Sequence, residues 1–150
     1  MIHLRDGVAK GSARHWQLPD RTFFAAGACH VLAAAVLRRW GGEAVWFRPD
    51  GPWAGNHIVV RIGGNAVDYL GLVPMTARLS HHARAGRRRW DAFRFTPVVL
   101  DPDDLTGGSP SRRHPGLHLR AAHQFLHDPG PRAETFLDRL TAPQFRGTSP

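Results

Sequence analysis

The spacing of apolar and polar residues in the first third of the chain predicts a helix followed by a strand. Residues 23–37 form an apolar, alanine-rich run, which predicts a loop that turns into a helix from about Ala28 to Trp40. Gly41-Gly42 ends this helix, because glycine readily adopts the left-handed backbone that closes a helix C-terminus. Residues 43–48 then predict a strand, which stops at the turn-forming residues 49–52.

Two β-rich runs, residues 56–62 and 66–70, flank Gly63-Gly64-Asn65 and predict a β-hairpin. Alternate residues of a strand face opposite sides, so His57 points away from the apolar row that starts at Ile58. If the two glycines form a two-residue turn, Asp68 lies on the same face as His57. The two residues are then diagonal neighbours, about 7–8 Å apart at the backbone, and their side chains can meet.

The remaining segments carry weaker signals. Residues 1–22 predict an irregular arm, residues 74–91 a basic helix, and residues 93–100 an edge strand, because Pro97 cannot donate a ladder hydrogen bond. The Gly-, Ser- and Pro-rich residues 106–115 are expected to form a mobile loop. Two short helices near 116–127 and 132–140 are predicted to close the chain, and the tail at 143–150 is expected to fray.

These elements predict one α+β domain over residues 1–150. An apolar fraction of 42%, with five Trp and eight Phe, is enough for one core. No window reaches the roughly 18 apolar residues of a membrane span, and the N-terminus lacks an apolar signal region. We therefore expect a cytoplasmic protein, or one delivered into another cell by a signal-independent route.

The single cysteine, Cys29, is the strongest candidate for chemistry. It allows no internal disulfide and no cysteine-based zinc or iron–sulfur site, which favours a reducing compartment. It also falls at the N-terminus of the predicted helix, where free N–H groups and the helix dipole favour the nucleophilic thiolate. A small buried cysteine without chemistry is the alternative interpretation.

Three short motifs, in this order along the chain, resemble the papain-like superfamily, and within it the transglutaminase-like and other small cysteine hydrolases. They are Gly27-Ala28-Cys29-His30 before an alanine-rich helix, Asn56-His57 at a strand start, and Val67-Asp68-Tyr69 on the next strand. The resemblance covers residues 27–71. It implies a papain-like or transglutaminase-like core, in which a cysteine-bearing helix packs on an antiparallel sheet that carries the histidine and the aspartate.

The same resemblance implies roles for individual residues. Cys29 would be the nucleophile, His57 the general base, and Asp68 the group that orients the imidazole. Papain-like peptidases place a glutamine shortly before the cysteine, and this chain has none there. Gln17 or Trp16 is therefore expected to supply an oxyanion donor beside the backbone N–H of Cys29.

The implied reaction is attack on an amide or ester carbonyl through an acyl-enzyme, without metal or cofactor, as in a peptidase, a glutamine deamidase or a transglutaminase. A small basic cysteine enzyme also resembles the toxin and effector domains that bacteria deliver into other cells. We expect a protein or peptide substrate. We expect His30 to matter less than His57, because it points along the helix, and Asp68→Asn to leave stability nearly intact.

The net charge of +8 predicts an acidic partner. The basic residues around Trp90 and Phe93 are expected to bind it without taking part in bond breaking; they are Arg84, Arg87, Arg88, Arg89 and Arg94. A non-catalytic, arginine-rich module that binds nucleic acid is the alternative function.

Two histidine pairs have the spacing of four that lets two imidazoles share a metal ion on a helix. They are His114 with His118 and His123 with His127. No carboxylate accompanies either pair in the pattern of a zinc enzyme. We therefore expect solvated surfaces there and no metal site.

Overall fold

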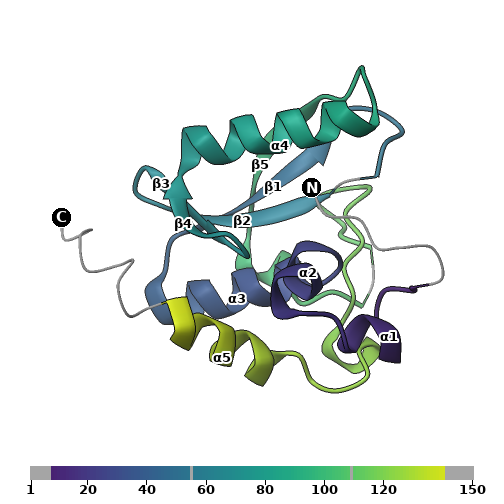
Figure 1. The fold of residues 1–150 in the computed structure, drawn as a ribbon, viewed down its shortest axis with the longest axis vertical. Coiled ribbons are helices and arrows are strands. Elements are labelled where there is room, and N and C mark those ends of the chain that lie inside the picture. Colours follow the sequence, from purple (N-terminus) through teal and green to yellow (C-terminus); the bar gives the residue numbers. More distant parts are fainter. Residues whose placement is uncertain (1–7, 55, 109, 141–150) are drawn as a thin grey trace.

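The computed structural model describes residues 8–54, 56–108 and 110–140 and has an α+β fold built on one antiparallel sheet (Figure 1). The sheet has five strands in the order β4-β3-β2-β1-β5. The strands are β1 (Glu43–Pro49), β2 (His57–Ile62), β3 (Asn65–Asp68), β4 (Gly71–Pro74) and β5 (Phe95–Leu100). Helices cover both faces, so the sheet is the middle layer.

Helix α3 (Cys29–Trp40) packs on one face of the sheet, and its far side is covered by α5 (Gly130–Leu140). On this side the core contains Trp46, Ile58 and Val60. Helix α4 (Met75–Arg89) covers the opposite face, as Figure 1 shows above the sheet. The side chains beneath α4 include those of Val45, Phe47, Val59 and Ala66.

The hairpin has the predicted register. Ile62 pairs with Asn65 and Val60 with Val67, across a two-residue turn in which Gly63 has a φ of 58°. A positive φ is strained for other residues, so glycine suits this turn. His57 and Asp68 therefore lie on the α4 face, with Phe47 and Ala66 as neighbours on adjacent strands.

The edge strand is also confirmed: β5 lies at one edge of the sheet and pairs only with β1, with Pro97 opposite Phe47. Strand β4 was not predicted. A tight turn after β3 reverses the chain into β4. In this turn Asp68 Oδ1 accepts a hydrogen bond of 2.9 Å from Leu70 N, and Gly71 has a φ of 88°.

The prediction of an irregular arm over residues 1–22 is wrong for the part that the structure describes. Two short helices lie there, α1 (Ala13–Trp16) and α2 (Asp20–Ala25), and the latter continues into the predicted loop. Long-range contacts stabilise them: Arg132 of α5 bonds Asp20 at 2.8 Å and the carbonyl oxygens of Trp16 and Leu18 at 2.6 Å.

The prediction of a helix near 116–127 is also wrong. That segment is mostly irregular and contains only the 3₁₀ turn η2 (Ala122–Gln124), and a second such turn, η1 (Pro102–Leu105), follows β5. Backbone groups of 117 and 119 instead accept bonds from Ser111 and Gly108, so the chain pairs with the irregular 106–115 loop. The predicted frayed tail at 143–150 lies outside the described residues.

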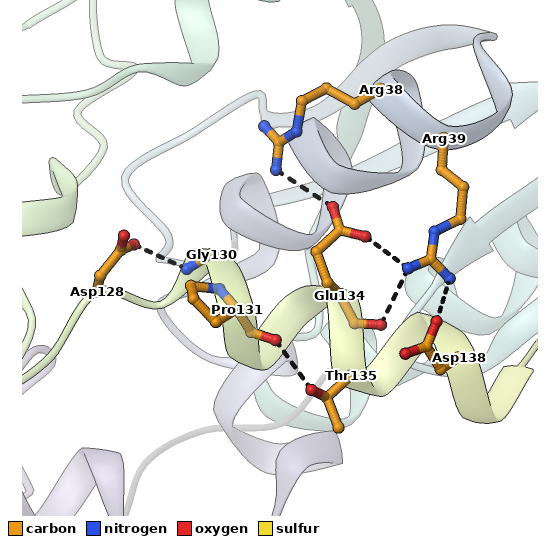
Figure 2. A network of polar contacts seen from close by, with 8 residues as sticks. All are labelled: Arg38, Arg39, Asp128, Gly130, Pro131, Glu134, Thr135 and Asp138. Carbon is orange, nitrogen blue, oxygen red and sulfur yellow. Dashed lines mark hydrogen bonds and ion pairs between the residues drawn. The ribbon is translucent and has the colours of Figure 1, made fainter.

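Helix α5 is fastened to α3 by ion pairs at their surface (Figure 2). Arg39 contacts Glu134 at 2.6 Å and Asp138 at 2.8 Å, and Arg38 approaches Glu134 at 3.5 Å. Within the described part of the chain, no helix is long and apolar enough to cross a membrane.

Candidate active site

Cys29 is the first residue of α3 and is buried, with 9% of its surface exposed. Gly27 makes the preceding turn with a φ of 113°. The first backbone bonds of the helix are donated by Val31 and Leu32 to the carbonyl of Ala28. The N–H groups of Cys29 and His30 lie before these donors and have no acceptor inside the helix, so they can donate hydrogen bonds to an anionic oxygen.

His57 and Asp68 meet as the hairpin register predicts. His57 Nε2 lies 2.8 Å from Asp68 Oδ2, and both side chains are almost fully buried. Since Nε2 is engaged by the carboxylate, Nδ1 is the ring nitrogen left for Cys29. The structure therefore brings all three predicted residues together, with the cysteine reaching the end of the sheet from α3.

Asp68 also pairs with a buried arginine side chain that the sequence pattern did not predict. Arg78 of α4, only 1% exposed, donates from Nε to Asp68 Oδ2 at 2.6 Å. Its guanidinium also lies 5.7 Å from the ring centroids of Phe47 and Tyr69. Asp68 thus accepts hydrogen bonds from His57, Arg78 and the backbone N–H of Leu70.

These contacts shift the titration of the three groups. Burial opposes the thiolate, but hydrogen bonds with His30 and His57 and their positive charge lower the pKa of Cys29 to about 5. Burial lowers the pKa of His57, but the bond to Asp68 and the contact with Cys29 outweigh it, so the pKa is raised. Burial opposes ionised Asp68, yet His57 and Arg78 lower its pKa to about 2. The arrangement favours a thiolate–imidazolium pair.

His30 contributes more to the thiol than its expected orientation along the helix implied. It helps to lower the pKa of the Cys29 thiol, and its Nε2 donates to the carbonyl of Arg120 at 2.7 Å. A histidine directly after a cysteine is the only sequence signal for this effect.

His15 fixes the loop that leads into Cys29. Its Nδ1 accepts from Gly11 N at 3.0 Å and its Nε2 donates to the carbonyl of Ala26 at 2.8 Å. Burial is the main cause of its lowered pKa, and the two bonds suit the neutral ring. No local pattern distinguishes this histidine from the exposed ones.

His82, one turn after Arg78 on α4, is buried beside the site. Its ring centroid lies 6.1 Å from that of His57, and both of its ring nitrogens lack hydrogen-bond partners. Burial, together with the charges of His57 and Arg78, lowers its pKa to about 2, so the ring is neutral. Its spacing of four from Arg78 is the sequence signal that both face the sheet.

The two predicted oxyanion donors are the last residue of α1, Trp16, and its C-cap, Gln17. The ring of Trp16 packs against Phe23 and His127, and Arg132 lies over it at 5.1 Å. Gln17 is exposed at the end of α1. None of these contacts involves Cys29, so the oxyanion role of both residues stays a prediction.

The five predicted partner-binding arginines are exposed, four on α4 and Arg94 after it. We call them the arginine surface: Arg84, Arg87, Arg88, Arg89 and Arg94. They lie on the helix that covers the sheet opposite α3, and Arg89 stacks over Trp90 at 5.3 Å. No group of three or more potential ligands among the described residues could hold a metal ion, and neither histidine pair lies on one helix.

Comparisons with protein-family models, curated proteins and solved structures found no match to this chain.

Proposed function

We propose that this protein is a cysteine enzyme that attacks an amide or ester carbonyl and forms an acyl-enzyme on Cys29. The observation that carries the proposal is the placement of the buried His57 between the Cys29 thiol and the Asp68 carboxylate, 2.8 Å from the latter. The papain-like, transglutaminase-like core implied by the sequence belongs to this proposal. A cysteine helix packed against a sheet that carries the histidine and aspartate supports it.

The proposed reaction begins with attack of the Cys29 thiolate on the carbonyl carbon, forming a C–S bond. The oxyanion is held by the N–H groups of Cys29 and His30 at the helix start. The C–N or C–O bond then breaks, and imidazolium His57 gives its proton to the leaving group. Neutral His57 next takes a proton from water or an amine, which attacks the thioester and releases the thiolate.

The second nucleophile separates the candidate activities. Water gives a peptidase or a glutamine deamidase, and an amine gives a transglutaminase. We further propose that the substrate is an acidic protein or peptide, because the arginine surface offers exposed charge away from the nucleophile. Action as a bacterial toxin or effector fits the same reaction.

Reaction with p-nitrophenyl acetate tests the proposal, because all thiol chemistry of the chain reports Cys29. We expect a burst of one p-nitrophenolate per protein and an acetyl adduct on Cys29 by peptide mass spectrometry. A synthetic peptide of residues 25–33 carries the same thiol without the fold and is the control. Acylation no faster than in that peptide would contradict the proposal.

Two matched variants locate the base. His57→Gln removes the proposed base and is expected to slow acylation by about 10²-fold or more. His123→Gln changes an exposed histidine outside the site and is expected to leave the rate unchanged. Circular dichroism of both variants establishes that the fold is retained.

A further inference from the structure

A cavity of about 460 Å³ runs along α3 on the side of α5, and His30 is part of its wall. We propose that this cavity, called the α3 groove, binds an aliphatic acyl chain of the substrate whose carbonyl is attacked by Cys29. The inference rests on the proposed function and adds a substrate class to it. The volume lies within the roughly 300–1,000 Å³ typical of small-molecule sites.

The groove is continuous with the proposed site through His30. This residue directly follows Cys29 in α3 and also lines the groove. Further along α3, the lining residues recur every three positions, at Val31, Ala34 and Leu37. Such spacing places them on one stripe of the helix, so the groove leads away from the nucleophile along the helix axis.

The walls suit a neutral aliphatic chain. Opposite the α3 stripe, Pro102, Leu105 and Pro129 supply further apolar surface. Two of the three Arg and Asp residues of the lining are engaged, since Arg38 approaches Glu134 at 3.5 Å and Asp128 accepts from Gly130 N at 2.9 Å (Figure 2); the third is Arg120, whose backbone oxygen accepts from His30 Nε2. An occupant therefore gains mainly by moving methylene groups out of water.

A series of p-nitrophenyl esters on the wild-type protein tests the groove. In each, the thiolate forms the C–S bond and p-nitrophenolate leaves with the electron pair of the broken C–O bond. Each buried methylene should raise the acylation kcat/KM about fourfold. Hexanoate has four methylenes more than acetate, so burial of only two of them should make it exceed acetate by about tenfold or more. Acetate and hexanoate reacting equally fast would overturn the groove and leave the proposed enzyme standing.

Filling the groove supplies the matched variants. Ala34→Phe places a ring in the lining and is expected to bring the hexanoate rate within about twofold of the acetate rate measured on the same variant. Ala77→Phe makes the same change on the exposed side of α4 and should keep the preference for hexanoate. An unchanged preference in a folded Ala34→Phe protein would place the chain elsewhere.

Binding of unreactive hexanamide separates the groove from the chemistry. Amide resonances of Val31, Ala34 and Leu37 in ¹⁵N NMR spectra should shift on titration, even if no ester acylates Cys29. An absence of shifts at these residues up to the solubility limit would overturn the inference. Acylation by acetate without those shifts would retain the enzyme and remove the groove.

Discussion

Replacing Asp68 by asparagine is expected to destabilise the fold strongly, because it removes the counter-charge of a buried arginine. Arg78 is 1% exposed, and its only ion pair among the described residues is with Asp68. Removing one partner of a buried pair costs about 3–5 kcal/mol. Domains of this size are stable by about 5–15 kcal/mol, so the loss is a large part of the total. This revises the expectation that Asp68→Asn leaves stability intact.

Urea unfolding followed by tryptophan fluorescence measures the effect. Asp91→Asn, at an exposed aspartate, is the control and should change stability by less than about 0.5 kcal/mol. Arg78→Met in the Asp68→Asn background removes the stranded charge and should recover part of the loss. The reasoning is refuted if Asp68→Asn costs less than about 1 kcal/mol, or if the double variant equals the sum of the single ones.

Three further outcomes follow from the structure. Alkylation of Cys29 by iodoacetamide should reach half its maximal rate near pH 5 and stay flat through neutrality, whereas a midpoint near about pH 8.5 would mean an ordinary thiol. Stability should fall as pH drops from about 4 towards 2, since the lowered pKa of Asp68 stabilises the fold only while the carboxylate is ionised; an acid titration by circular dichroism that shows no loss there contradicts this. Changing Arg87, Arg88 and Arg89 to glutamine should weaken binding to an acidic protein substrate and leave acylation by p-nitrophenyl acetate unchanged. Loss of acylation in a folded variant would instead place these arginines in the active site.

The pairing of His57 with Asp68 could be predicted because strand periodicity and a two-glycine turn are local properties. Once Ile62 pairs with Asn65, the faces of both side chains follow. The start of the helix at Cys29 could also be predicted from nearby residues, since Gly27 precedes it and Gly41 follows the helix. The strongest local signals in the chain thus coincide with the candidate site.

Arg78 and His30 could not be assigned in the same way, because their roles depend on tertiary contacts. Arg78 looks like the other arginines of a basic helix until α4 docks over Phe47 and Asp68. The helix predicted near 116–127 failed for a related reason. Its backbone groups find partners in the 106–115 loop, which outweighs local helix propensity.

Cys29 and Arg78 lie on helices that cover opposite faces of the sheet, and this placement has a consequence for protein synthesis. Cys29 leaves the ribosome sixty residues before Arg89 ends α4, and β5 must still follow to flank β1. Domains generally fold as units while the chain grows at about 5–20 residues per second. A nascent chain therefore carries Cys29 for seconds before Arg78 of α4 can be buried against Asp68. The order of the elements along the chain therefore sets the completion of the Asp68 contacts after the synthesis of α4.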